Sequence, residues 1–251
     1  MISIFRAVLI FILLFACSVL AQDINTIKTK AENGDADSQY NLGMFYILGQ
    51  GVPQSDVEAS KWFRRAANQG LADAQLSFGL AYYEGKGVPR DYAEAAVWYR
   101  RAAEQELAYA QYSLGIISGL GQGVVQDYVE AANWFRKAAE QGLAQAQHLL
   151  GLAYYEGEGV PQDYAEAAKW YRKAAEQGYA NAQNSIGCMY AKGHGVYKDY
   201  VLAHMWFTLS ANQGNEEAVK FRDIAATQMT DEEMAQSHKL ATEWTPKLNE
   251  K

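Results

Sequence analysis

The sequence predicts an all-α protein, a solenoid of helix–turn–helix repeats. A tryptophan recurs every 36 residues along most of the 251-residue chain, and a single glycine and a Gly-x-Gly pair recur with the same spacing. A fixed period of this length is typical of repeat proteins whose units are small stacked supersecondary elements. The tryptophans are Trp62, Trp98, Trp134, Trp170 and Trp206. The five predicted repeats span residues 36–71, 72–107, 108–143, 144–179 and 180–215.

Residues 1–21 have the pattern of an export signal rather than of a folded element. One positive charge, at Arg6, precedes an uncharged and mostly apolar run that ends with small residues at Val19 and Ala21, which a signal peptidase accepts. We expect cleavage after Ala21, a periplasmic or secreted protein, and no membrane span in the mature chain. An uncleaved anchor is one alternative, although about 15 residues are short for a ~30 Å hydrocarbon core. A lipoprotein attached through Cys17 is another.

The composition argues against several classes of function and of stabilisation. The chain carries 22 basic and 29 acidic side chains, a formal net charge of −7, which argues against a general affinity for nucleic acid phosphates. Signal cleavage leaves Cys188 as the one cysteine, so we expect no intramolecular disulfide and a stability that comes from core burial. We interpret Cys188 as a small buried apolar residue, the alternative being a reactive thiolate.

The predicted elements begin with a half-repeat in residues 22–35, because Ala31-Glu32-Asn33-Gly34 aligns with the end of the third repeat. In the second repeat, apolar residues spaced at i, i+4, i+7 and i+8 predict a first helix over residues 72–84. Glycine costs about 1 kcal/mol relative to alanine inside a helix, so we attribute Gly79 to close approach of the neighbouring helix. The turn Gly-Lys-Gly-Val-Pro then ends this helix.

A capping box is predicted at the start of the second helix in each of the first four repeats, as at Asp91 and Glu94. The second helices end at a glycine, except that Glu106 replaces it in the second repeat, where we expect a looser end. Each second helix of the first four repeats also carries two adjacent basic residues. We interpret these as a solvated outer face, away from the aromatic side of the helix. The basic pairs are Arg64/Arg65, Arg100/Arg101, Arg136/Lys137 and Arg172/Lys173.

Residues 216–251 are predicted to form capping helices, at about 216–228 and 231–244. In the fifth repeat Met205 stands where the fourth repeat has a lysine, and Thr208-Leu209 replace the basic pair. An apolar surface of this kind must be covered, and solenoids need such a terminal cap. Thr230 and Glu233 predict a capping box at the start of the last helix.

The repeats follow the pattern A-x-A-Q-x-x-L-G-x-x-Y-x-x-G-x-G-V-P-x-D-Y-x-x-A-x-x-W-Y-R-x-A-A-E-Q-G, which resembles the Sel-one-like repeat, a relative of the tetratricopeptide repeat. Residues 144–179 match it almost throughout. The resemblance implies a right-handed α-solenoid, a tetratricopeptide/Sel-one-like superhelix whose first helices line the concave surface. It also implies an adaptor or scaffold that binds other proteins. A cysteine-rich secreted branch is described as penicillin-binding or weakly β-lactamase-like, but its cysteine pair per repeat is absent here.

We predict no enzyme activity, no cofactor and no metal site. No serine is followed by a lysine three residues later, as penicillin-recognising enzymes require. The four histidines have no metal-binding spacing. The Gly-x-Gly turns lack the third glycine of a dinucleotide-binding loop and follow a helix rather than a strand. The recurring Asp/Glu pairs are explained by helix capping.

The predicted partner-binding residues lie on the first helices, at positions where the repeats differ from one another. Tyrosines exposed along a groove give a large contact area at low entropy cost. The alternative is that these rings pack on the first helix of the next repeat. The predicted residues are Tyr40, Leu76, Tyr83, Tyr109, Tyr112, His148, Tyr155 and Asn184.

The sequence therefore favours an exported, non-catalytic and monomeric scaffold that binds a protein or peptide through its concave face. It does not favour nucleic acid as a partner. One alternative is a cell-wall-related enzyme or a glycan- or penicillin-binding protein, because aromatic grooves also stack against sugars. Another is a structural or chaperone-like subunit of a secretion assembly.

Overall fold

The computed structural model describes residues 24–249, and every regular element within that range is an α-helix. This confirms the predicted all-α class. The expected signal segment, its cleavage position at Ala21 and the alternative lipid attachment at Cys17 lie outside the described residues. The helices are α2 (Ile24–Glu32), α3 (Ala36–Leu48), α4 (Asp56–Asn68), α5 (Ala72–Glu84), α6 (Tyr92–Glu104), α7 (Ala108–Leu120), α8 (Tyr128–Glu140), α9 (Ala144–Glu156), α10 (Tyr164–Glu176), α11 (Ala180–Lys192), α12 (Tyr200–Ala211), α13 (Glu216–Ala226) and α14 (Asp231–Asn249).

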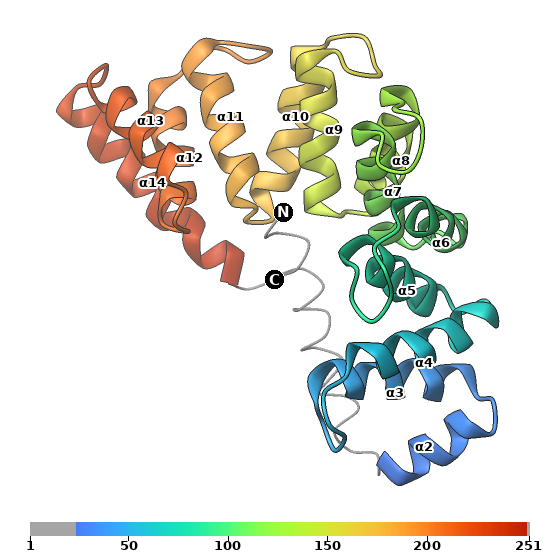
Figure 1. The fold of residues 1–251 in the computed structure, drawn as a ribbon. Helices are drawn as coiled ribbons and strands as arrows, with labels where there is room; N and C mark the ends of the chain where they lie inside the picture. The colour runs from blue at the N-terminus through green and yellow to red at the C-terminus, as the bar shows by residue number, and fades with distance from the viewer. Residues whose placement is uncertain (1–23, 250–251) are drawn as a thin grey trace. The chain divides into compact units, whose positions relative to one another are not determined.

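The described chain forms two compact units, whose helices can be followed in Figure 1. Unit one holds residues 24–110 and 122–124, and in it each helix from α2 to α6 packs against the next. Unit two holds residues 111–121 and 125–249; there α8 to α13 pack in the same way, and α14 packs against α12. Within each unit, first and second helices of successive repeats therefore alternate, as the sequence predicts.

A glycine in the middle of each first helix lies against an aromatic ring of the second helix. A Cβ added at Gly43 would lie 2.6 Å from Cε1 of Phe63, and one at Gly151 would lie 2.7 Å from Cδ1 of Tyr171. Carbon atoms pack at about 3.5–4.0 Å, so no side chain fits there. The same contact joins Gly79 to Tyr99, Gly115 to Phe135 and Gly187 to Phe207. The structure confirms that the glycines permit close helix approach, and it identifies the ring as the neighbour.

Two glycines with positive φ shape each turn. Gly157 ends α9 with φ 75° and donates its N–H to the carbonyl of Ala153 at 2.8 Å, a conformation that glycine adopts without strain. Gly159 leaves room for the start of α8 in the preceding repeat, because a Cβ there would overlap the carbonyl of Tyr128. The turn of one repeat is thus seated on the second helix of the repeat before it.

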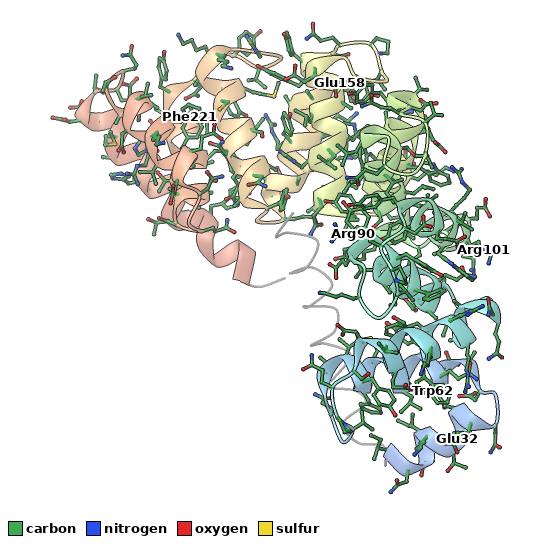
Figure 2. All side chains as sticks on the ribbon, in the orientation of Figure 1. Glu32, Trp62, Arg90, Arg101, Glu158 and Phe221 are labelled. Atoms are coloured by element: carbon green, nitrogen blue, oxygen red, sulfur yellow. The ribbon has the colours of Figure 1, made fainter. Side chains whose placement is uncertain are left out.

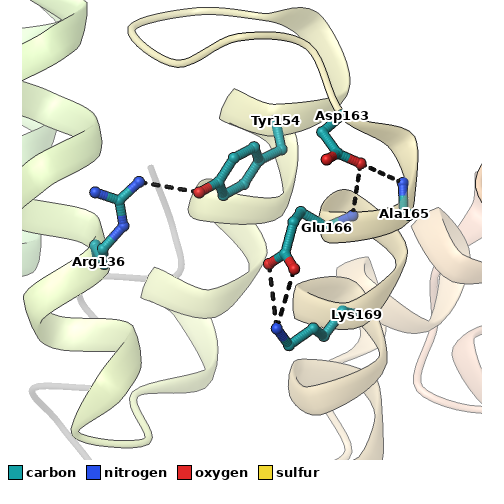
Figure 3. A network of polar contacts seen from close by, with 6 residues as sticks. All are labelled: Arg136, Tyr154, Asp163, Ala165, Glu166 and Lys169. Atoms are coloured by element: carbon teal, nitrogen blue, oxygen red, sulfur yellow. Dashed lines mark hydrogen bonds and ion pairs between the residues drawn. The ribbon is translucent and has the colours of Figure 1, made fainter.

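The second helices begin with a side-chain N-cap but not with the predicted capping box. Asp163 accepts hydrogen bonds from the backbone N–H groups of Ala165 and Glu166, at 2.8 and 3.0 Å (Figure 3). The backbone N–H of Asp163 donates to the carbonyl of Tyr154 on α9, so it is already engaged. The Glu166 carboxylate pairs instead with Lys169, at 3.0 Å (Figure 3). The predicted N-cap is confirmed. The predicted hydrogen bond from the Asp163 N–H to the Glu166 carboxylate is wrong, because that N–H donates to the first helix instead.

A buried glutamine on each first helix bonds to a glutamine of its own second helix, and such a glutamine also links its repeat to the repeat before it. Gln147 donates a side-chain N–H to the carbonyl of Ala139 at 3.1 Å and accepts one from Gln177 at 2.7 Å. Because buried amides are costly without partners, these bonds favour one register between neighbouring repeats. The same side-chain pairing joins Gln39 to Gln69, Gln75 to Gln105, Gln111 to Gln141 and Gln183 to Gln213.

Helices α13 and α14 cover the last repeat. The rings of Trp206 and Trp244 meet edge to face with their centroids 5.0 Å apart, which holds α14 on α12. At the start of α14 the predicted capping box is confirmed. The backbone N–H of Thr230 donates to the Glu233 carboxylate at 2.8 Å, and the Glu233 N–H donates to the Thr230 hydroxyl at 3.2 Å.

Glu106 follows α6 in the conformation that glycine adopts in the other repeats. Its φ is 64°, its N–H donates to the Ala103 carbonyl at 3.0 Å, and Leu107 donates to Ala102 at 3.3 Å. These are the hydrogen bonds of the other repeats, so the expected looser end is wrong. A left-handed conformation costs a residue with a Cβ about 1–2 kcal/mol, and Glu106 carries that strain.

We predict that Gly151→Val lowers the free energy of unfolding by about 1–3 kcal/mol, because the added carbons must displace the Tyr171 ring from a packed core. Urea unfolding measures the change. The control is Gly119→Ala on α7, where a Cβ would lie 3.4 Å from the Cβ of Ala131. That variant should gain about 0.5–1 kcal/mol from helix propensity. An unchanged stability in Gly151→Val would contradict the packing role.

We predict that Glu106→Gly raises the free energy of unfolding by about 0.5–1 kcal/mol, because glycine adopts positive φ without a Cβ penalty. Thermal melting monitored by circular dichroism at 222 nm, a helix band, measures the effect. Glu104→Gly, at the last residue of α6, is the matched control and should lose stability, because glycine has a lower helix propensity than glutamate. Equal effects of the two substitutions would show that Glu106 is not strained.

Candidate partner-binding face

One stripe of side chains on the first helices faces solvent in unit two. It follows the helical spacing i, i+4, i+7, i+11, and its members are half-buried or exposed, including Leu152 with 38% of its surface exposed. We call this stripe the first-helix face. It consists of Gln145, Leu149, Leu152 and Glu156 on α9 and of Asn181, Ser185, Cys188 and Lys192 on α11.

The parts of this face on α9 and α11 adjoin each other. Nε2 of His148 lies 3.2 Å from Oγ of Ser185, and Lys192 donates to the Tyr155 hydroxyl at 3.4 Å. The Ser185 hydroxyl donates to the Asn181 carbonyl at 3.0 Å, so it accepts the hydrogen bond from His148. Helices α9 and α11 therefore contact each other near both of their ends, and their stripes form one continuous surface across the fourth and fifth repeats.

Tyr40, Tyr112 and Asn184 are buried, with 6%, 8% and 7% of their surfaces exposed, so the expectation that they line an open groove is wrong. Each tyrosine ring packs on the aromatic residue of its own second helix. The ring centroids of Tyr40 and Phe63 are 5.7 Å apart, and those of Tyr112 and Phe135 are 6.3 Å apart.

Asn184 is engaged by the C-terminal cap, because its side-chain N–H donates to the Glu217 carboxylate at 3.0 Å. The residue therefore links α11 to α13. Its position in the fold explains its burial, since α13 occupies the place that the first helix of a sixth repeat would take.

The remaining predicted residues, Leu76, Tyr83, Tyr109, His148 and Tyr155, are half-buried. Several of them also pack within the fold. The ring of Tyr83 lies 5.2 Å from that of Tyr92, and the rings of Tyr155 and Tyr164 are separated by the same distance. His148 and Tyr155 border the first-helix face rather than project from it.

The sequence prediction missed an apolar row within the stripe. On α9 and α11 this row is Leu152 and Cys188, and on α7 it includes the half-buried Ile116. Apolar residues at these positions look like core residues in a periodicity pattern. Their spacing in the sequence could have identified them, because Leu152 and Cys188 each follow a variable polar residue, Gln145 or Asn181, by seven positions and so lie on the same side of the helix.

The central part of the face in unit two is uncharged. Burial lowers the pKa of His148 to about 4 and raises the pKa of the Cys188 thiol to about 11, so both are neutral near pH 7. Charge lies only at the ends of the stripe, at Glu156 and Lys192. In unit one the corresponding surface carries Asp37 and Asp73 at the start of the stripe, and burial and the nearby Asp37 raise the pKa of Asp73.

The basic pairs of the second helices pack against aromatic residues, so the expectation that they lie away from the aromatic side is wrong. Nζ of Lys173 lies 4.1 Å from the ring centroid of Trp170, within cation–π range. Arg136 on α8 donates to the Tyr154 hydroxyl on α9 at 3.0 Å (Figure 3). The same stacking places Arg65 over Trp62, Arg101 over Trp98 and Lys137 over Trp134. Arg101 and Trp62 are labelled in Figure 2.

Two further observations concern the described range alone. Within residues 24–249, no group of three or more His, Cys, Asp or Glu side chains is arranged to hold a metal ion. In the same range no helix combines the length and the apolar character that crossing a membrane requires.

Comparisons with known proteins give a family and several similar solved structures. The Sel1 repeat model matches residues 36–71, 72–107, 108–143, 144–179 and 180–215. No curated protein matches the chain. A protective antigen of uropathogenic Escherichia coli strains with an SLR fold is 36% identical over 91% of this chain and 56% of its own, with a TM-score of 0.80. A Sel1 repeat protein from Oxalobacter formigenes is 38% identical over 75% of this chain and 77% of its own, with a TM-score of 0.71.

The chain thus spans little more than half the length of the E. coli protein. The similarity to both structures extends over most of this chain and includes the helical repeat fold.

We predict that the protein loses stability as the pH falls from about 6.5 towards 4. Burial depresses the folded-state pKa of His148 to about 4, while the unfolded chain takes up this proton near pH 6.5. The unfolded state therefore binds more protons across this window, and the free energy of unfolding decreases with acidification. His204, buried beneath α14 with Nδ1 2.9 Å from the Ser237 hydroxyl, acts in the same direction.

Urea unfolding across that pH range measures this dependence. His148→Leu places at this position the residue that the second repeat carries as Leu76, and it should make the dependence shallower while leaving the contribution of His204. An identical pH slope in the variant would contradict the burial of a neutral His148.

Proposed function

The chain belongs to the Sel1 repeat family, whose members are generally protein-interaction scaffolds, and we propose that it binds a protein or peptide partner through the first-helix face without catalysing a reaction. The observation that carries this proposal is the exposed apolar row within an otherwise polar stripe. Leu152 is 38% exposed beside the half-buried Leu149 and Cys188. Cys188 also packs against the core of unit two, whereas the exposed Leu152 side chain is available to pack on a partner.

The proposed ligand is an extended polypeptide segment that presents an apolar side chain to this row. Glu156 and Lys192 lie on the neighbouring helices α9 and α11 at the end of the stripe, and hydrogen-bonding groups of Gln145 and Asn181 lie near its start. An apolar centre with a polar rim is the usual composition of a protein–protein interface. The half-buried Tyr155 and His148 complete the border of this surface.

We also propose that the protein is exported. The apolar run of residues 7–21 and the small residues that end it support this proposal. The similar E. coli protein is a protective antigen, which is in keeping with a protein that the immune system meets. An exported scaffold of this kind acts on a partner in the cell envelope or outside the cell.

Site-specific photo-cross-linking tests the binding proposal. Leu152 replaced by a benzophenone amino acid should yield cross-links to a polypeptide in cells that produce the protein. Ile224 on α13, which is 62% exposed, gives the matched control and should yield none to that polypeptide. Mass spectrometry of the cross-linked species identifies the partner.

We further predict that Leu152→Glu weakens binding of the identified partner by about tenfold or more, because a charge then enters the apolar contact. Ile224→Glu should leave the affinity unchanged, and circular dichroism should show both variants folded. Full affinity of Leu152→Glu would remove the first-helix face from the function.

A further inference from the structure

The second and fourth repeats pair two tyrosine rings beside the turn. One tyrosine comes from the last turn of the first helix and the other begins the second helix. The ring centroids of Tyr83 and Tyr92 are 5.2 Å apart, and those of Tyr155 and Tyr164 are 5.2 Å apart. Each second-helix ring is half-buried, and Tyr164 is also covered by the His194 ring of the fifth repeat, which stacks on it with the centroids 4.6 Å apart.

The fifth repeat covers its ring in another way. Ala191 replaces the first tyrosine, and Nζ of Lys198 lies 4.8 Å from the ring centroid of Tyr200. The ammonium group thus takes the place of the missing ring as a cation–π partner, and Tyr200 stays half-buried.

The third repeat leaves its ring more exposed than the other three repeats do. Gly119 stands where the neighbouring repeats have a tyrosine, and Tyr128 is 43% exposed. Gln126 donates to the Tyr128 hydroxyl at 2.9 Å and to the Gly119 carbonyl at 2.8 Å, so it holds the edge of the ring rather than covering its face. A Cβ at Gly119 would meet one neighbouring atom within 4 Å, the Cβ of Ala131 at 3.4 Å.

The backbone around this gap matches that of the fourth repeat. Gln162 donates to the Tyr155 carbonyl at 2.8 Å, as Gln126 does to Gly119. The N-cap N–H of the second helix donates to the first helix at 2.9 Å in both repeats. The third repeat therefore has the same local backbone but lacks, beside Tyr128, the ring that Tyr155 supplies in the fourth.

Exposed apolar residues stand close to Gly119 and Tyr128 in the sequence. Leu120, Val125 and Val129 are 59%, 88% and 58% exposed. The fourth repeat carries Glu156, Pro161 and Ala165 at the corresponding positions. The third repeat thus combines a missing ring with added apolar surface, which folding of the chain alone does not require. We call Gly119, Leu120, Val125, Tyr128 and Val129 the third-repeat notch.

We propose that the third-repeat notch receives an aromatic side chain of a partner polypeptide, which packs on Tyr128 as Tyr155 packs on Tyr164. The chain's own repeats supply the argument for the occupant, because a tyrosine ring fills the same backbone frame twice. Aromatic pairs prefer edge-to-face or tilted contacts at 4.5–7 Å, and the exposed leucine and valines extend that contact. The notch lies at the turn, apart from Leu152, so it is a second contact surface beyond the proposed function.

A titration with p-cresol, the side-chain analogue of tyrosine, tests the notch directly. With ¹³C-labelled tyrosine in the full chain, millimolar p-cresol should shift the ring resonances of Tyr128 and leave those of Tyr92 and Tyr164 in place. Gly119→Tyr, which supplies the missing ring, should abolish the shift. Gly119→Ala should retain it, because the added methyl does not supply a ring. No shift at Tyr128, or an unchanged shift in Gly119→Tyr, would overturn the proposal.

Selection of displayed peptides on the wild-type chain, with counter-selection on Gly119→Tyr, tests the polypeptide occupant. Selected peptides should share one aromatic residue, and its replacement by alanine should weaken binding by about tenfold. Peptides without an aromatic residue would overturn the proposal. So would self-association of the wild type that Gly119→Tyr removes in sedimentation velocity, because a second copy would then be the occupant.

The two proposals fail independently. Leu152→Glu should leave the p-cresol shift at Tyr128 unchanged, because Leu152 is not part of the notch. Loss of cross-linking at position 152 with a retained p-cresol shift would count against the first-helix face alone. The reverse result would count against the notch alone.

Discussion

The contact between a helix glycine and an aromatic ring sets the geometry of every repeat. Because Gly151 has no side chain, the Tyr171 ring packs directly on the backbone of α9, and the two helices approach closely. That ring then covers the side chain three residues before the glycine: the centroids of His148 and Tyr171 are 5.4 Å apart. The burial of Tyr40 and Tyr112 follows from the same arrangement in the first and third repeats.

Contacts between repeats use a different set of atoms. The second glycine of each turn lets the backbone lie against the preceding second helix, as Gly159 does at Tyr128. The buried glutamines of the first helices add hydrogen bonds between repeats, such as that from Gln147 to the Ala139 carbonyl. These contacts rely on backbone and on residues that barely change between repeats. The side chains at the solvent stripe and at the turn edge can vary without disturbing the stack, and the proposed contact surfaces lie there.

Polar residues that suggest a catalytic or ionic site in the sequence are engaged within the fold. Asp163 caps α10 through two backbone N–H groups, and Lys173 stacks on Trp170. His204 is buried against Ser237. Burial holds His148 neutral, so the first-helix face of unit two offers apolar contact and hydrogen bonds rather than a strong field. Such a surface is suited to recognition of side-chain shape.

The sequence by itself determined the repeat period, the all-α class, the turn glycines and the N-caps, because each depends on local backbone chemistry that recurs every 36 residues. Only the tertiary structure decided which acceptor each backbone N–H bonds to and which side chains face solvent. The Asp163 N–H bonds to α9 instead of completing a capping box, and Tyr112 packs inward while Leu152 faces solvent. Helical periodicity gives the direction of a side chain on its own helix, whereas its burial depends on neighbouring helices that periodicity does not place.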